Sequence, residues 1–491
     1  MISLGLGGPG AVAEVKPTSQ RQRQREMLEL LEERWQQACN ELNQGRQSIG
    51  LAEAIRTGLL NNPILTEQYA SVQASQWQAR AIRREWSPTL TGNNPNPEAI
   101  AIRQDRLSTD SRTDINTQQS TSEKLTNSFY SSPRLQLNWT FLDPTRTPRL
   151  KSSLANERSR QLLFDISARN LILEIQGSYY RLQEARELRE DYNRIYELTR
   201  KQVVRAIQLR KAGAGTQGDV DQLRAQLFQQ LVQLIQIYEQ EVIAANQLAY
   251  TLSLEPGQLL LPSEKLRPSG TWELALQTTI EEALALREEI KSSLARAEQY
   301  GWSAKARLNS YLPSVSILGQ SQLNTNNQLD QTVGSTGWSE TITRGVRNDL
   351  GLTFKWLMFD GGVTVAESQA LREQANSAKA QAANDRLEVT LQVQNSYATY
   401  NSSNMVIDTS QEQLREARKS VEYTASVYNG STIAATVFIQ NIQSYLNASQ
   451  AYKSSVRRFN TALAALYRYS ARWPEGSTAD LNQRLIKLSG S

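Results

Sequence analysis

The stretches LQLNWTFLD (Leu135–Asp143) and LTFKWLMFD (Leu352–Asp360) of this 491-residue chain decide its fold. In and around both stretches, apolar residues alternate with polar ones, so an extended backbone has one apolar side and one wet side. This period of two predicts β-strands, with the apolar side as the candidate lipid-facing surface. The residues of that side are Leu135, Leu137, Trp139, Phe141, Leu350, Leu352, Phe354, Trp356 and Met358.

The two stretches occupy equivalent places in an internal repeat. The segment that begins at Leu51 aligns without a gap with the segment that begins at Leu276, and Trp77 and Pro88 then fall on Trp302 and Pro313. We interpret the chain as two copies of one large unit. The predicted divisions are an N-terminal extension (residues 1–48), repeat 1 (49–253), a linker (254–275), repeat 2 (276–470) and a C-terminal tail (471–491).

Each copy has the same predicted order of elements. A helix (Leu51–Glu85 or Leu276–Ser310) precedes a strand, a polar loop, a second strand, a very long helix, a glycine-rich turn and a return helix. The predicted strands cover about residues 88–95, 131–142, 313–323 and 348–359, and the segments Leu107–Asn127 and Gln320–Glu340 between them are predicted to be long polar loops.

The strands have two interpretations, a membrane barrel or an amphipathic sheet in a soluble sandwich. Each copy offers a single strand pair among helical residues, so the chain contains no partner sheet, and long polar loops are typical of outer-membrane barrels. No segment approaches the roughly 18 apolar residues of a membrane-spanning helix. One chain has too few strands to close a barrel, and open edges are not tolerated in lipid. Two or three chains would have to share it.

The helices after the second strands are unusually long. Asp143, Pro144 and Pro148 predict a helix start, and the helix continues to about Lys211 with apolar residues spaced by three and four, as in a coiled coil. Some 65 residues would span about 100 Å, and Val363–Tyr428 matches this helix in the second copy. A soluble coiled-coil scaffold is therefore the alternative to a membrane duct.

Glycine-rich segments interrupt both long helices, and we predict helical hairpin tips there. A phosphate-binding loop is a weak alternative interpretation of the glycines, because no strand precedes them and no Gly-Lys-Ser/Thr follows. Asp219 and Asp221 follow the first tip as candidate gate residues or as ordinary helix N-terminal carboxylates; Thr436 and Ile439 occupy the matching places. The tip residues are Gly213, Ala214, Gly215, Thr216, Gly218, Asn429, Gly430, Ser431 and Thr432.

The composition argues against catalysis. The chain has no histidine and one cysteine, Cys39, so it lacks the commonest general base and metal ligand and forms no intrachain disulfide. The net charge of +5 is spread along the chain, which favours solvated helix faces over a nucleic-acid site. We expect no enzyme activity, no cofactor, no metal and no nucleic-acid partner.

The N-terminal extension has no counterpart in the second copy. Residues Ile2–Ala13 are weakly apolar but have no basic flank, so they do not predict a signal peptide. A helix is predicted at Gln20–Asn43, without a functional interpretation.

This ordered set of features resembles the TolC family of outer-membrane efflux proteins over about residues 50–470. The resemblance rests on the duplication, on the strand ends Trp139–Asp143 and Trp356–Asp360, and on the tip segments KAGAGTQGDVDQLRAQ and YNGSTIAATVFIQNIQ. It implies a mainly α protein with a small membrane β part. Three chains would form a twelve-stranded barrel in the outer membrane, continued by an α-helical barrel in the periplasm.

The resemblance also implies a function and partners. The protein would be a passive conduit for efflux or type I secretion, gated at its periplasmic tips. The tips would dock onto a periplasmic adaptor (membrane fusion) protein of an inner-membrane transporter. Part of the linker, Leu254–Trp272, and the tail after Trp473 would contribute to an equatorial belt. The resemblance does not indicate the cargo.

Overall fold

A computed structural model describes residues 30–31, 33–37, 40, 46–93, 101–112, 119–255, 257–332, 336–427, 435–474, 479–482 and 485. The chain divides into two compact units. Each takes segments from both sequence repeats, so the compact units are not the repeats. The first unit comprises Met1–Thr66, Ser167–Arg287 and Val389–Ser491, and the second comprises Glu67–Ile166 and Glu288–Glu388.

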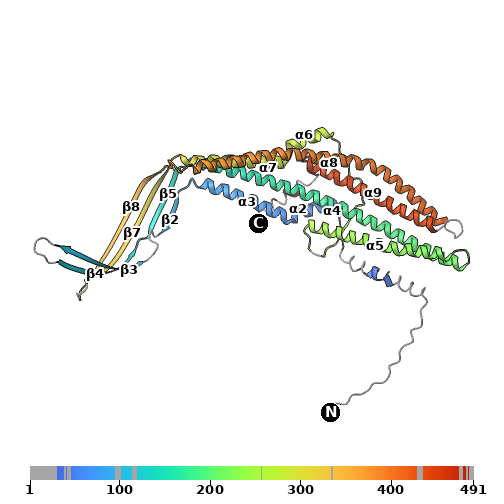
Figure 1. The fold of residues 1–491 in the computed structure, drawn as a ribbon, viewed down its shortest axis with the longest axis horizontal. Coiled ribbons are helices and arrows are strands. Elements are labelled where there is room, and N and C mark those ends of the chain that lie inside the picture. Colours follow the sequence, from blue (N-terminus) through green and yellow to red (C-terminus); the bar gives the residue numbers. More distant parts are fainter. Residues whose placement is uncertain are drawn as a thin grey trace, which may run out of the picture. The chain divides into compact units, whose positions relative to one another are not determined.

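The second unit contains a six-stranded sheet. Its strands are β2 (Thr89–Asn93), β3 (Ala101–Arg112), β4 (Gln119–Ser131), β5 (Arg134–Leu142), β7 (Ser314–Thr332) and β8 (Trp338–Lys355). All described pairings in it are antiparallel, and β2, β5, β7 and β8 can be followed side by side in Figure 1.

Six strands make only four strand runs. β4 and β5 pair with the same edge of β7 in one continuous register, Ser131 opposite Thr325 and Arg134 opposite Gln322. They are one run interrupted at Ser132–Pro133, where proline has no N–H to donate. On the outer side of this run, β2 pairs with β5 and β3 pairs with β4. Pairing of four runs therefore agrees with the two strands predicted for each copy.

The predicted polar loops at Leu107–Asn127 and Gln320–Glu340 are wrong in large part. β3 and β4 cover much of the first segment, and β7 and β8 cover much of the second. The segments are rich in Ser, Thr, Asn and Gln on both sides of the pleat, so they carry no alternation, yet their backbones still pair. At the other end, Trp356 and Met358 lie beyond the last residue of β8, Lys355.

The single helices predicted at Leu51–Glu85 and Leu276–Ser310 are also wrong, because each is broken. The first is α2 (Leu51–Asn61) and α3 (Pro63–Arg84), separated by Asn62 in an extended conformation, since a residue before proline disfavours the helical region. Asn62 stabilises the break by accepting a hydrogen bond from Ile64 N and donating one to Thr251 O, both at 2.9 Å. The second is α6 (Leu276–Leu286) and α7 (Glu288–Leu308), separated by Arg287.

The long helices are α4 (Arg146–Lys211) and α8 (Val363–Val427), and both contribute to both units. In the second unit, α4 packs on α7 through small side chains, with hydroxyl contacts between Ser152 and Ser303 at 2.8 Å and between Ser159 and Ser292 at 3.1 Å. A short 3-10 helix, η1 (Asn309–Tyr311), follows α7 and leads into the sheet. Among the described residues, none of the helices has the length and hydropathy of a membrane-spanning helix.

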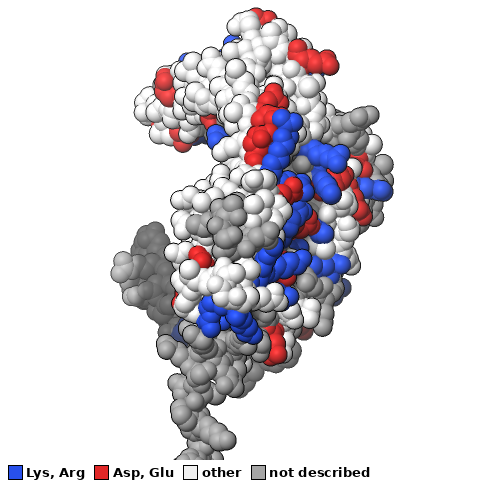
Figure 2. All heavy atoms as spheres, turned by 90° about the vertical axis from the view of Figure 1, so that its right-hand side faces the viewer, with Lys and Arg blue, Asp and Glu red and all other residues white. Residues whose placement is uncertain are grey.

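The first unit completes two helical hairpins, α4 with α5 (Gln217–Thr251) and α8 with α9 (Ala435–Tyr469). Near the turns, buried side chains of α5 and α9 form one core, which includes Leu223, Leu227, Phe438 and Ile442. Basic and acidic side chains are intermixed on the face drawn in Figure 2. This agrees with a small net charge that is spread along the chain.

The predicted linker at residues 254–275 packs in the first unit. Its strand β6 (Leu260–Pro262) pairs in parallel with β1 (Gln47–Ile49), and Leu266 is buried against Tyr400 and Phe459. In the tail, the indole of Trp473 lies 4.0 Å from the Arg169 guanidinium. Both segments are therefore held to the long helices, where the resemblance places a belt.

Candidate functional site

The sheet of the second unit has two chemically distinct faces, fixed by its register. Residues directly opposite each other share a face, so Trp139, Ile317 and Leu352 form one row. The neighbouring row on the other face joins Thr140, Ser316 and Thr353. The first face also carries Leu90, Leu135, Leu137, Val315, Leu350 and Phe354, and the second also carries Thr89, Thr91, Gln136, Asn138, Gln320 and Asp349.

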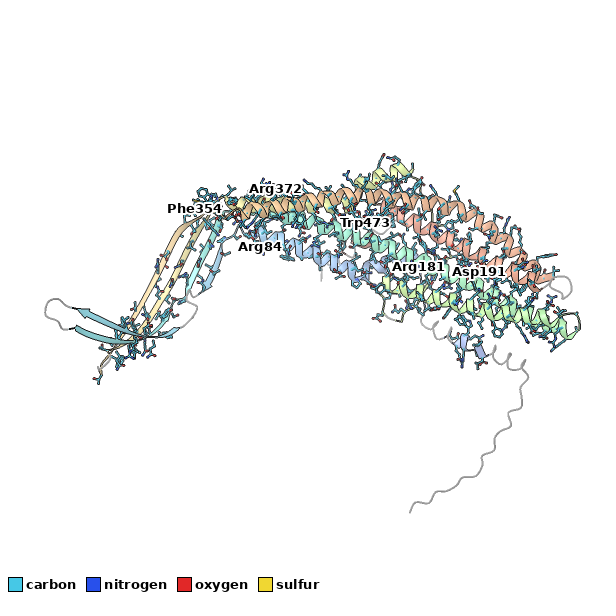
Figure 3. All side chains as sticks on the ribbon, viewed as in Figure 1. Arg84, Arg181, Asp191, Phe354, Arg372 and Trp473 are labelled. Atoms are coloured by element: carbon cyan, nitrogen blue, oxygen red, sulfur yellow. The ribbon has the colours of Figure 1, made fainter. Side chains whose placement is uncertain are left out.

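No described part of the chain covers the apolar face. Leu350 is 81% exposed and Leu352 is 73% exposed, whereas large apolar side chains in a folded chain are normally buried. Phe354 comes from β8 next to its junction with the helices, as Figure 3 shows. A continuous exposed apolar face opposite a polar face is what a sheet with lipid on one side and water on the other requires.

Both edges of the sheet are open in the described part of the chain. β8 pairs with β7 on one side, and at the opposite edge β2 and β3 pair with β5 and β4. The outer backbone groups of β8 and β2 therefore have no strand partner within these residues. Unpaired edges template the addition of another strand.

The strands join the helices through two equivalent joints, one per sequence repeat. Trp139 Nε1 donates to Trp86 O at 2.9 Å, and Trp356 Nε1 donates to Tyr311 O at 3.0 Å. A carboxylate then begins each long helix. Asp143 accepts from Thr145 N at 2.9 Å, and Asp360 accepts from Gly362 N at 3.0 Å and from Thr364 N at 2.9 Å.

The joint in the second repeat explains why β8 ends at Lys355, before the end of the strand predicted at about 348–359. The indole bond of Trp356 and the capping role of Asp360 turn the backbone out of β8 after Lys355. The side chains of Trp356 and Met358 are nevertheless exposed, at 50% and 72%. Phe141 lies at the irregularity between Thr140 and Leu142, where the register with β7 shifts.

The first helical tip is a tight turn between Lys211 and Gln217. Gly213 has φ +75°, the left-handed conformation that ends a helix and that glycine adopts without strain. Ala214 N donates to Leu209 O at 2.9 Å. A side chain at Gly215 would meet the backbone N of Arg210 at 3.2 Å, so this position favours glycine. The predicted turn is therefore present at Gly213, Ala214 and Gly215.

The two candidate gate carboxylates lie in the first turn of α5. Thr216 is the N-cap: its Oγ1 accepts from Asp219 N at 3.1 Å and donates to Asp219 Oδ2 at 2.7 Å, which resembles a capping box. Asp221 accepts from Gln217 Nε2 at 2.7 Å. Their contacts are those of helix N-terminal carboxylates, and Gly218 lies in the same turn. The second tip, Asn429, Gly430, Ser431 and Thr432, lies outside the described residues.

A buried ion pair, not anticipated from the sequence, joins α4 to α9. Asp191, labelled in Figure 3, accepts from Lys453 Nζ at 2.5 Å and from Ser449 Oγ at 2.6 Å. Burial alone would raise the pKa of the Asp191 carboxyl, but the Lys453 ammonium and nearby hydroxyls outweigh it, so the pKa lies below its ordinary value. Burial, together with the Asp191 carboxylate, raises the pKa of Tyr445 to about 12.

A second ion pair lies two turns away. Glu184 accepts from Arg457 Nε at 2.5 Å. Here burial dominates, and the pKa of the Glu184 carboxyl is raised despite the Arg457 charge. Both pairs hold the α4 and α9 helices together at one level of the first unit.

Part of the chain is similar to a known protein family. Residues 279–472 match the family model described as outer membrane efflux protein. That segment is similar to outer membrane efflux proteins. The matched segment covers almost all of the second repeat, and no curated protein sequence matches the chain.

Solved structures of outer membrane proteins share the fold over both repeats. The CmeC outer membrane channel of Campylobacter jejuni has 14% identity and a TM-score of 0.68, covering 88% of this chain and 89% of its own. The VceC outer membrane protein of Vibrio cholerae has 15% identity and a TM-score of 0.62, with coverage of 86% and 96%. The open-state MtrE outer membrane channel of Neisseria gonorrhoeae has 14% identity and a TM-score of 0.61, with coverage of 87% and 94%.

The shared fold confirms the predicted fold class. The fold is mainly helical with a small β part. The tip and lipid-facing assignments stay predictions.

Proposed function

We propose that this chain is one protomer of an outer-membrane efflux channel, a homotrimer that forms a continuous duct from the periplasm, across the outer membrane, to the exterior. The sheets of three chains would join edge to edge into a closed barrel. Their apolar faces would contact lipid and their polar faces would line water. The long helices would continue the duct into the periplasm as a helical barrel.

The single observation that carries the proposal is the two-faced, open-edged sheet. Its exposed Leu350 and Leu352 require an apolar surrounding, while Gln136, Gln320 and Asp349 on the other face require water. Unpaired edges are costly in hydrocarbon, so further strands from other chains must complete the ring. Bacterial barrels with about eight or more strands satisfy both conditions.

The direct test is reconstitution. The purified protein should migrate as an oligomer in an unheated detergent gel and as a monomer after boiling, and it should form conducting channels in planar bilayers. A water-soluble monomer that remains in the aqueous fraction and carries no current would overturn the proposal.

We also propose that the helical tips bind a periplasmic adaptor (membrane fusion) protein linked to an inner-membrane transporter. The first tip offers a compact turn with small residues, Gly213, Ala214 and Gly215, which lets a partner backbone approach closely. Substitution of Ala214 by Arg should abolish crosslinking to the adaptor without loss of the heat-modifiable oligomer. Crosslinking at the native level would remove this tip from the docking surface.

Gating at the tips is the remaining part of the proposal. If Asp219 and Asp221 narrow the periplasmic mouth, their joint substitution by Ala should raise the single-channel conductance. Thr216→Ala serves as the control, because it weakens the same helix start without removing a carboxylate. An unchanged conductance in the aspartate variant would assign both carboxylates to helix capping alone.

A further inference from the structure

The polar face of the sheet carries two arginine side chains in one row, and the proposed channel does not by itself explain them. The register places Asn93, Arg134, Gln322 and Arg347 in one row across β2, β5, β7 and β8. Arg347 precedes Leu350 by three residues, about 10 Å along the strand. The row therefore lies on the wet face, just beyond the apolar run that begins at Leu350.

The two arginines differ in what holds them. Arg347 Nε donates to Asp349 Oδ1 and Oδ2 at 3.2 and 3.0 Å, so a carboxylate one row away balances its charge. Arg134 instead donates from Nε and Nη2 to Gln322 Oε1 at 3.2 and 2.9 Å. That acceptor is neutral, so it orients the Arg134 guanidinium without neutralising it.

Gln322 is itself held in place. Its Nε2 donates to Asn324 Oδ1 at 2.7 Å, on the same face of β7. An arginine has five N–H donors, and Gln322 occupies two of them. The guanidinium is thus fixed at the polar face with donors still available to a solute.

The neighbouring rows make this level distinct. Asp349 lies in the next row toward the helices, with Thr91, Gln136 and Gln320. The following rows hold Thr89, Asn138, Leu318 and Gly351, and then Thr140, Ser316 and Thr353, all uncharged. Two arginines and one aspartate leave one net positive charge per chain at this level.

We propose that Arg134 and Arg347 form an anion-selective ring inside the outer half of the barrel, so that the duct favours anionic solutes, such as carboxylates and phosphates, at this level. The proposal rests on the proposed trimeric channel, since three chains would repeat the row around one pore. Rings of arginine or lysine side chains confer anion preference on other pores, because their field adds up where low-dielectric walls surround a narrow water column.

The test measures ion selectivity in planar bilayers under a KCl gradient. The double variant Arg134→Gln with Arg347→Gln should lower the chloride-to-potassium permeability ratio at least about twofold at 0.1 M salt, where the Debye length is about 10 Å. The difference should shrink at 1 M salt, where screening reaches only about 3 Å. Asp349→Asn should shift the reversal potential in the opposite direction, because it removes the negative charge beside Arg347.

Arg344→Gln provides the matched control. Arg344 lies on the same strand, three residues from Arg347 and therefore on the opposite face, so its loss should leave the reversal potential unchanged. The proposal would be overturned if Arg344→Gln and the double variant shifted the reversal potential equally. It would also be overturned if the double variant and Asp349→Asn both conducted with the native reversal potential. A native protein that carries no current would instead overturn the channel itself. If the double variant does not assemble, Asp349→Asn alone decides: an unchanged reversal potential refutes the ring.

Discussion

The two faces of β8 allow a paired substitution that tests the membrane assignment at neighbouring residues. Leu352 lies at the centre of the apolar run from Leu350 to Phe354, and Thr353 follows it on the wet face opposite Ser316. An arginine on the lipid face near the bilayer midplane costs about 2–4 kcal/mol. Three chains in one barrel would multiply this to about 6–12 kcal/mol for Leu352→Arg.

Thr353→Arg introduces the same charge into water. Its cost should stay within about 1 kcal/mol per chain, the range of strand propensities. The assay is denaturant-dependent folding into lipid vesicles, together with the amount of heat-modifiable oligomer in the outer-membrane fraction. Leu352→Arg should lose most of the oligomer, while Thr353→Arg keeps it. Similar losses in both variants, or a greater loss in Thr353→Arg, would refute the assignment of the two faces.

Three further predictions concern the helical unit. Lys453→Met should destabilise the helical unit by about 3–5 kcal/mol in chemical denaturation, because the substitution leaves the Asp191 carboxylate buried without its cation. Adding Asp191→Asn should recover part of that loss. A double variant no more stable than Lys453→Met alone would contradict this prediction. Since the folded pKa of Glu184 is raised above its unfolded value, this carboxyl contributes stability that is present below about pH 4.5 and lost as the pH rises through the folded pKa. The Tm of the native protein relative to Glu184→Gln should therefore increase as the pH falls from 7 toward 4.5, and a difference that is constant with pH argues against a raised pKa. Thr216→Ala should cost about 1 kcal/mol through loss of the N-cap, seen as faster amide exchange in the first turn of α5 and not in α9; native exchange rates there would show that the cap contributes nothing.

The part of the sheet that sequence could predict is the part with one apolar face. Near Leu135 and Leu352, only one side of the strand is apolar, so alternation is visible in the residue order. Farther along β7 and β8, only a few apolar residues, such as Leu323 and Val346, stand among polar ones on one face, and pairing depends on backbone bonds that leave no mark on side-chain polarity. Those strand halves therefore resembled loops.

The two helix breaks also differ in whether the sequence predicts them. Pro63 marks the first break directly, since it restricts Asn62, whereas the second break at Arg287 has no such residue beside it. Arg287 is held by long-range contacts to Tyr469 O at 3.3 Å and Gln392 Oε1 at 3.0 Å.

Of the candidate sites, the first tip could be predicted from the sequence, because the local backbone at Gly213, with its φ of +75°, requires glycine. The pair of Asp191 and Lys453 was not, because its members are 262 residues apart and neither belongs to a local motif. The row of Arg134 and Arg347 likewise exists only through the strand register.

The unpaired edges at β2 and β8 have a genetic consequence. In the proposed trimer, each chain pairs its edge strands with those of its neighbours, so one defective edge would leave a gap in a ring of otherwise normal subunits. In a cell that expresses an intact and an edge-damaged allele together, mixed rings would outnumber pure ones. Lesions confined to these two strands would then be dominant, whereas alleles that yield no protein would be recessive.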